Sequence, residues 1–223
     1  MRDDTEQYLE LLLGGSEEPA NWRLLNERGD GRPIQYHNKS LSDAVVKHFD
    51  AKQDENYGVF IVVNDGGERD EHIRNVRACF IDADGVMMPT DWPIEPSFYV
   101  MRDATHWHAY WLLDEGEDTS EYKETQQILA TYYGTDIAVC NLSRVMRVPG
   151  FYHRKGKPIY INLEEGDVDR RSSLAQLRHA HPVERAPQVH KTIAENIVKG
   201  GRHTAFVSAA AHCRNAGLLE QEI

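Results

Sequence analysis

The spacing of hydrophobic residues along the chain predicts an alternation of strands and helices. Residues 58–64 and 76–82 are rich in β-branched and aromatic side chains and apolar on both faces, which is typical of central strands that are covered on both sides. Shorter apolar or alternating segments predict further strands at 22–25, 34–36, 96–101, 107–113, 144–148 and 159–163. Helical spacing predicts helices at 5–13, 42–49, 121–133 and 172–179. We therefore expect an α+β fold in which helices pack against a mixed β-sheet.

The last part of the chain is expected to form a separate helical segment. Residues 181–192 contain two prolines and mixed charges, so we expect a linker there, after a first domain at 1–180. Gly200 and Gly201 separate two short helical patterns in the remaining segment, 193–223, and a third pattern begins at Leu218. Because the sequence stops inside that pattern, we interpret this C-terminal helical segment as incomplete and the chain as a fragment of a longer protein.

The composition is that of a globular protein, with 40% hydrophobic and 27% charged residues. No apolar run approaches the roughly 18–20 residues that a membrane span needs, and the N-terminus lacks the basic and apolar regions of a signal peptide. The three cysteines are odd in number and widely spaced, which argues against a disulfide framework or a zinc site. We expect a cytoplasmic protein that does not bind membranes.

The charge is distributed unevenly along the sequence. The formal net charge is −11, which by itself argues against a nucleic-acid partner. Residues 1–139 carry 12 Lys and Arg against 28 Asp and Glu, whereas residues 140–203 carry 12 against 6. A surface that binds phosphate groups is therefore expected between Cys140 and His203.

Two acidic residues end the apolar segment 76–82. Asp82 and Asp84 are spaced by one residue, so on a strand their carboxylates lie on the same face. The two carboxylates repel each other and lose hydration, and a divalent cation can offset this cost by bridging them. The alternative is a simple turn at Asp84 and Gly85, with Asp82 capping it.

Two histidines stand in an alternating pattern at the start of the predicted strand at 107–113. His106, His108 and Tyr110 share one face, and Trp107 and Trp111 lie on the other, which is expected to be core. The histidines then point toward a polar surface or cleft, where one of them can contact phosphate, bind a metal or transfer a proton. The alternative is a pair of partly exposed histidines at the edge of a sheet.

A basic cluster follows in the second half of the chain. Arg144, Arg147, Arg154 and Lys155 lie within twelve residues and are interleaved with apolar residues. Guanidinium groups bind phosphate in a bidentate manner and lysine acts as a point charge, so this composition is typical of a triphosphate or nucleic-acid site. Ion pairs with the acidic first half are the alternative.

The order of these motifs resembles the catalytic core of the archaeo-eukaryotic primase superfamily, and in particular the RepB-type primases and primase-polymerases of plasmids and phages. The resemblance covers roughly residues 20–180 and rests on Asp82-Ala83-Asp84, on a histidine in a Trp-rich strand, and on an Asp followed by the segment 144–150 and His153-Arg154-Lys155. The segment from Gly200 to Leu218 is similar to the helical domain that often follows such primases and commonly leads on to a helicase.

This resemblance implies an RRM-like primase core that makes primers on a single-stranded DNA template in plasmid or phage replication. It implies that nucleoside triphosphates are the substrates, that two Mg²⁺ or Mn²⁺ ions act as cofactors, and that a helicase is a possible downstream partner. The site residues that it implies are Asp82, Asp84 and Asp136 as metal ligands, with Asn141 as the alternative third ligand, His108, Arg144, Arg147 and Lys155 for the nucleotide, and Phe151, Tyr152, Arg154 and Arg202 for DNA.

Two other functions compete with this interpretation. His106-Trp107-His108 also resembles the metal-binding motif of HUH nickases, which cut single-stranded DNA with a tyrosine that Tyr132 or Tyr133 could supply. The third hypothesis is a non-catalytic module that binds single-stranded nucleic acid. The nickase hypothesis leaves Asp82, Asp84 and the basic cluster without a role.

Overall fold

A computed structural model describes residues 3–183. The predicted helical segment 193–223, Arg202 and most of the predicted linker 181–192 lie outside the described residues. The helices of the described part are α1 (Asp3–Leu13), α2 (Asp43–Asp54), α3 (Thr119–Tyr133) and α4 (Leu174–Ala180), with a 3₁₀ turn η1 (Asp70–His72). Within residues 3–183, no helix is both long enough and apolar enough to span a bilayer.

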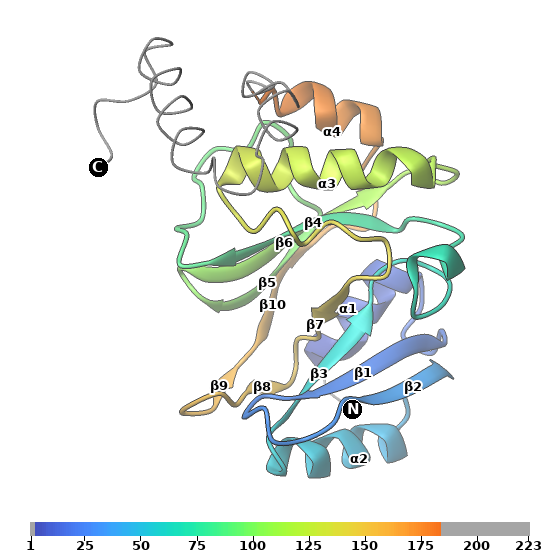
Figure 1. The fold of residues 1–223 in the computed structure, drawn as a ribbon, viewed down its shortest axis with the longest axis vertical. Coiled ribbons are helices and arrows are strands. Elements are labelled where there is room, and N and C mark those ends of the chain that lie inside the picture. Colours follow the sequence, from blue (N-terminus) through green and yellow to red (C-terminus); the bar gives the residue numbers. More distant parts are fainter. Residues whose placement is uncertain (1–2, 184–223) are drawn as a thin grey trace, which may run out of the picture. The chain divides into compact units, whose positions relative to one another are not determined.

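One antiparallel sheet has the order β2-β1-β3-β7 (Figure 1). Its strands are β1 (Ala20–Asn26), β2 (Ile34–Lys39), β3 (Tyr57–Val62) and β7 (Val145–Arg147). Strand β3 is central and almost wholly buried, as its apolar sequence predicts. Strand β2 is mostly exposed, which its polar sequence allows because it forms an edge of the sheet.

A second sheet has the order β10-β5-β6-β4 and carries the motifs of interest. Its strands are β4 (Ala78–Asp84), β5 (Phe98–Asp103), β6 (His106–Leu113) and β10 (Asn162–Gly166), and the short β11 (Arg171–Ser172) pairs in parallel with the end of β6. A hairpin of β8 (Tyr152–His153) and β9 (Ile159–Tyr160) follows β7.

The outer edge of β4 is covered by side chains of α3. Gln126 accepts a hydrogen bond from the Phe80 amide (2.9 Å) and donates one to the Phe80 carbonyl (3.1 Å), and the Tyr122 hydroxyl donates to the Ala78 carbonyl (3.1 Å). These bonds satisfy backbone groups that a neighbouring strand would otherwise pair. Strand β4 can therefore be an edge strand and still be buried on both faces.

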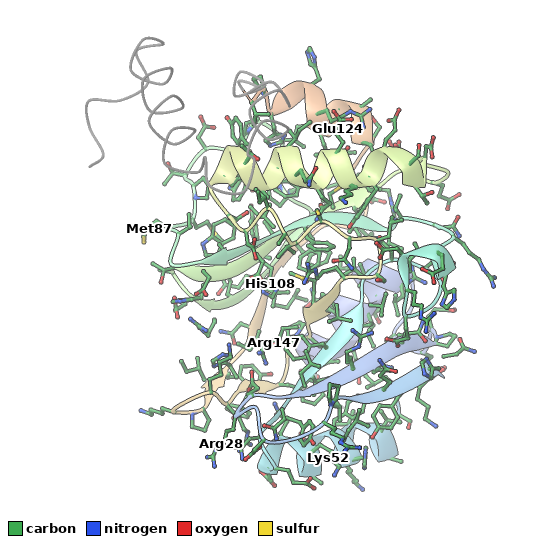
Figure 2. All side chains as sticks on the ribbon, viewed as in Figure 1. Arg28, Lys52, Met87, His108, Glu124 and Arg147 are labelled. Atoms are coloured by element: carbon green, nitrogen blue, oxygen red, sulfur yellow. The ribbon has the colours of Figure 1, made fainter. Side chains whose placement is uncertain are left out.

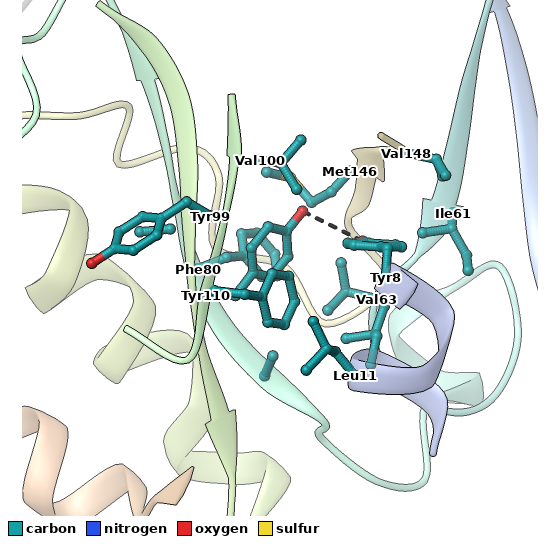
Figure 3. Packing of buried hydrophobic residues seen from close by; sticks show 14 of the residues in the cluster. Tyr8, Leu11, Ile61, Val63, Phe80, Tyr99, Val100, Tyr110, Met146 and Val148 are labelled. Atoms are coloured by element: carbon teal, nitrogen blue, oxygen red, sulfur yellow. Dashed lines mark hydrogen bonds between the residues drawn. The ribbon is translucent and has the colours of Figure 1, made fainter. Parts of the chain in front are cut away.

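The core between the two sheets is closed by α1. Tyr8 and Leu11 of this helix lie between Phe80 and Tyr110 of one sheet and Ile61 and other apolar residues of the other (Figure 3). The Tyr8 hydroxyl donates a hydrogen bond to the Tyr110 hydroxyl at 3.5 Å. This packing joins the sheets, so that residues far apart in the sequence meet along their inner faces.

The predicted α+β fold class is confirmed, and most predicted elements are present. Helix α2 begins after Ser42, whose side chain caps it, and α3 ends at Gly134, which has a left-handed φ of 66°. The expectation of one mixed sheet was wrong, because the apolar strands β3 and β4 belong to different sheets. Their second faces are covered by helices and by the facing sheet.

Candidate functional site

A cleft of about 580 Å³ is lined by residues of both sheets. Its acidic lining residues are Glu27, Asp82 and Asp84, and its basic and histidine lining residues are Arg28, Arg102, His106, His108, Arg147, His153 and Lys155. Figure 2 shows that His108 and Arg147 lie on the facing sides of the two sheets. The cleft therefore brings together the acidic, histidine and basic motifs singled out in the sequence.

The two aspartates face the two histidines across strands β4 and β6. The register pairs Asp82 with His108 and Asp84 with His106, and the corresponding carboxylate-to-Nε2 distances are 3.3 and 2.8 Å. The side chain of Asp82 is 43% exposed and that of Asp84 is 88% exposed. Both carboxylates therefore remain accessible to a ligand in the cleft.

Asp82 is held in its ionised form. Burial raises the pKa of this carboxyl group, but the charge and hydrogen bond of His108, together with the charges of Arg147 and Arg144, outweigh burial and lower the pKa below its ordinary value. An ionised carboxylate is the form that binds a cation.

The donor set fits a hard divalent cation. Within residues 3–183, no group of three or more His, Cys, Asp or Glu side chains forms a complete metal centre. Mg²⁺ is usually bound by one or two carboxylates together with substrate phosphates, not by a complete cage of protein ligands. Asp82 and Asp84 match that requirement.

A second cross-strand contact fixes His106. Its Nδ1 lies 2.7 Å from an Asp103 carboxylate oxygen, while its Nε2 faces Asp84. The hydrogen bond from His106, with others from Thr105 and Arg102, lowers the pKa of Asp103 well below its ordinary value. His106 is thus held between two carboxylates, whereas His108 contacts one.

His108 has an unused ring nitrogen. Its Nδ1 is buried and has no hydrogen-bond partner among residues 3–183. Buried polar atoms are normally paired, so this unpaired nitrogen is unusual.

The basic side of the cleft is built around Arg147. This side chain is 13% exposed, its guanidinium lies over the Phe60 ring with Cζ 4.5 Å from the centroid, and it forms an ion pair with Glu27. Burial lowers the pKa of Arg147, and the charge of Glu27 opposes that effect. Lys155, at the tip of the β8–β9 hairpin, is exposed and lines the same cleft.

His153 lies among these cations in its neutral form. Burial lowers its pKa, and the positive charges of Arg147, Arg102 and Lys155 lower it further, while Glu27 opposes them. Its Nε2 is 3.5 Å from Arg102 and 3.9 Å from Glu27. His153 therefore adds no positive charge to the cleft at neutral pH.

The other predicted basic and aromatic residues lie outside the lining of the cleft. Arg144 donates to the Ala138 carbonyl at 2.5 Å, although it is close enough to influence Asp82. Arg154 pairs with Asp54 of α2 at 3.3 Å, and its guanidinium lies over the half-buried Tyr152 ring.

The prediction that Phe151 contacts DNA was wrong. This side chain is 1% exposed and packs against Phe49 with 6.1 Å between ring centroids. Phe151 precedes the two-residue strand β8, and so short a segment has no alternating pattern that tells which of the two adjacent aromatic residues faces the core. Tyr152 is the more exposed one.

The two candidates for a third metal ligand, Asp136 and Asn141, do not line the cleft. Asp136 is exposed, and its carboxylate accepts a hydrogen bond from the Ala138 amide at 2.8 Å. Asn141 donates to the Ser143 hydroxyl at 3.2 Å. Their role as metal ligands stays a prediction.

Glu27, Arg28 and Arg102 line the cleft and were not singled out in the sequence. Glu27 and Arg28 follow β1 in a turn-rich segment, where charged residues are ordinary, and Arg102 is the last residue but one of β5. Only the meeting of the two sheets reveals their position, so no local pattern would have found them.

The tyrosines required by the nickase hypothesis lie on the wrong side of the sheet. Tyr133 stacks on Trp111 at 5.8 Å, on the face of β6 opposite to that of His106 and His108. Tyr132 is next to it on α3 and packs against Tyr133 and His181. Neither hydroxyl can reach a nucleotide held by the histidines without crossing the sheet.

The family described as RepB DNA-primase N-terminal domain matches residues 95–199, a range that includes His108 and Arg147 and begins after Asp84. Among curated proteins, none matches the chain.

Solved structures resemble the chain over most of its length. The archaeo-eukaryotic primase domain of the cyanophage S-2L primase-polymerase has 25% sequence identity and a TM-score of 0.62, covering 81% of this chain and 97% of that one. The primase RepB′ has 14% identity and a TM-score of 0.60, covering 95% of this chain and 68% of its own. The catalytic domain of RepB′ in complex with initiator DNA has 17% identity and a TM-score of 0.53, covering 80% and 94% of the two chains.

Proposed function

We propose that the chain is a RepB-type primase of the archaeo-eukaryotic primase superfamily and that it makes primers on single-stranded DNA by template-directed nucleotidyl transfer. The observation that carries this proposal is the opposition, across one cleft, of the Asp82 and Asp84 carboxylates to the cationic Arg147 and Lys155. Transfer of a nucleotidyl group needs both: carboxylates that hold cations and cations that neutralise a triphosphate.

The carboxylates hold divalent ions in this proposal. Asp82 and Asp84 bind Mg²⁺ or Mn²⁺, and Asp136, or alternatively Asn141, is the predicted third ligand. When bound, a pair of such ions activates the 3′-hydroxyl of the growing primer and stabilises the departing pyrophosphate.

The side chains of the cleft bind and orient the nucleotide. Arg147 offers guanidinium N–H groups to the phosphate oxygens, and Lys155 adds an ammonium group from the mobile end of a long side chain. His108, which lines the cleft beside Asp82, is the proposed histidine contact to the nucleotide. Arg144, behind the cleft, adds positive charge near Asp82.

The template is expected to run beside the basic second half of the chain. A similar structure is described as a complex with initiator DNA, which supports a DNA ligand here. Tyr152 and Arg154 are the described candidates for contacts to the template strand, and Arg202 is a further candidate from the sequence. A role in plasmid or phage replication, with a helicase downstream, belongs to the same proposal.

The test is synthesis on an unprimed template. Purified protein is incubated with single-stranded DNA, radiolabelled nucleotides and either Mg²⁺ or Mn²⁺, and the products are separated on a denaturing gel. We expect new oligonucleotides from the wild type and none from Asp84→Asn. Retention of the DNA without synthesis would overturn the proposal in favour of a binding module, and a covalent protein–DNA adduct would overturn it in favour of a nickase.

A further inference from the structure

A buried carboxylate lies in the wall of the cleft, at the end of β1. The side chain of Glu27 is 2% exposed, and its backbone amide donates to the Asn56 carbonyl at 2.9 Å, which continues the pairing of β1 with β3. A buried ionised side chain is costly unless it is fully paired. Its partners therefore show what it does.

Glu27 binds two parts of the basic motif with its two oxygens. Oε1 accepts a hydrogen bond from the Arg147 guanidinium, and Oε2 accepts one from the backbone amide of Arg154. The first partner is a proposed phosphate ligand, and the second begins the loop of the hairpin that carries Lys155. Both oxygens are thus used within the protein, so Glu27 differs from Asp82 and Asp84, whose carboxylates are accessible.

Space for this contact is made by a glycine. Strand order β1-β3-β7 places β3 between Glu27 and Arg147, and the β3 residue lying under the contact is Gly58. A Cβ atom at Gly58 would lie 2.6 Å from Arg147 Nη1 and 3.1 Å from Glu27 Cδ. Any larger residue would therefore displace the guanidinium.

The result is an arginine restrained on several sides. Glu27 holds one nitrogen of Arg147, Gly58 admits the other, and the Phe60 ring supports the plane of the guanidinium. A flexible arginine loses side-chain entropy when it binds phosphate, and fixing it beforehand removes part of that cost from binding. The remaining N–H groups can then bind an anion in the cleft.

We infer that Glu27 is a positioning residue, which holds Arg147 and the hairpin bearing Lys155 in the geometry that receives the polyphosphate of the nucleotide. This inference rests on the proposed function. It predicts that the charge of Glu27 strengthens nucleotide binding although it is negative and lies close to an anionic substrate.

The test is equilibrium binding of a fluorescent nucleoside triphosphate with Mg²⁺ and without template. Glu27→Gln keeps the shape of the side chain and removes its charge. We expect its Kd for the nucleotide to rise by about 10-fold, in the range of couplings measured between contacting charged groups. The KM for the nucleotide should rise in parallel, while kcat at saturation changes by less than about threefold, because a positioning residue that acts on binding leaves the chemical step unchanged.

A matched control is available in the same sheet. Glu68 pairs with Arg23 of β1, both side chains are largely buried, and neither lines the cleft. Glu68→Gln makes the same substitution in a similar ion pair, and we expect nucleotide binding within about twofold of the wild type. Circular dichroism and urea unfolding confirm that each variant is folded before binding is measured.

Gly58→Ala provides a second route to the same result. It keeps every charge and displaces the guanidinium, so we expect it to weaken nucleotide binding even if Glu27→Gln is too unstable to purify. A double-mutant cycle of Glu27→Gln with Arg147→Ala should be non-additive, because the first substitution acts through the second residue.

The outcomes distinguish a failure of the positioning role of Glu27 from a failure of the proposed function. If the wild type binds no triphosphate, the proposed function fails. If the wild type binds and the variants Glu27→Gln and Gly58→Ala bind equally well, the function stands and the positioning role is refuted. Tighter binding by Glu27→Gln would also refute it, since Glu27 would then be a neutralising group that opposes the substrate.

Discussion

The substitution Asp82→Asn, at the centre of the cleft, should greatly reduce synthesis and change the stability of the protein only slightly. It replaces one carboxylate oxygen by an amide nitrogen and keeps the side-chain volume, so it opens no cavity. The contact it weakens is the one to His108 Nε2 at 3.3 Å, in a side chain that is 43% exposed. Ion pairs that are this accessible contribute about 0.2–1 kcal/mol, so we expect the free energy of unfolding to fall by no more than about 1 kcal/mol.

The effect on synthesis should be far larger. The variant loses the negative charge that is proposed to hold a divalent ion at the reacting phosphate, and we expect the rate of incorporation to fall at least about 10³-fold, or ~4 kcal/mol of barrier. The assay is extension of a primed single-stranded template at saturating nucleotide, with urea unfolding of the same preparation.

The pH dependence of stability provides a second readout of this variant. The pKa of Asp82 lies below its ordinary value of 3.8, so its contribution to stability is present above that pH and is lost as the pH falls through the lowered pKa.

Asp65→Asn is the matched control, because Asp65 is 42% exposed, pairs with Arg77 at 3.0 Å and lies outside the cleft. If the activity of Asp82→Asn lies within tenfold of the wild type, or if Asp65→Asn loses as much activity, Asp82 does not hold a cation that synthesis requires.

Two further predictions concern the aromatic cluster behind the sheet. The double variant Tyr132→Phe and Tyr133→Phe should synthesise primers at the wild-type rate but lose about 1–3 kcal/mol of unfolding free energy, because the Tyr133 hydroxyl bonds the buried His181 at 2.8 Å; loss of synthesis with normal stability would contradict this. Burial lowers the pKa of His181 from 6.5, so the unfolding free energy should decrease as the pH falls below 6.5 through the lowered value. Urea titrations at pH 7 and pH 5 should show a smaller decrease in His181→Gln, and an unchanged decrease would exclude His181 as its source.

Local patterns in the sequence predicted the elements and the motifs that lie on single strands. The spacing of Asp82 and Asp84 is enough to place both carboxylates on one face of β4, and alternation places His106 and His108 together on β6. Helix caps such as Ser42 and Gly134 depend on nearest neighbours and are therefore readable in the same way.

What the sequence could not supply is the pairing of distant segments. The contact of Glu27 with Arg147 joins residues 120 positions apart, and no local period encodes it. The division into two sheets could not be predicted for the same reason. A strand such as β3 or β4 has the same apolar sequence whether a helix or another sheet covers its faces. Phe151 is buried against Phe49 of α2, whereas the adjacent Tyr152 is half-buried, and this difference also depends on a distant segment.

The most direct test of the account is a crystal structure of the protein soaked with Mn²⁺ and a non-hydrolysable nucleoside triphosphate. Anomalous scattering locates the manganese without ambiguity from other ions. We predict manganese bound directly by Asp82 and Asp84, with the triphosphate extending toward Arg147 and Lys155. Manganese and nucleotide bound together at any other place on the protein would contradict it.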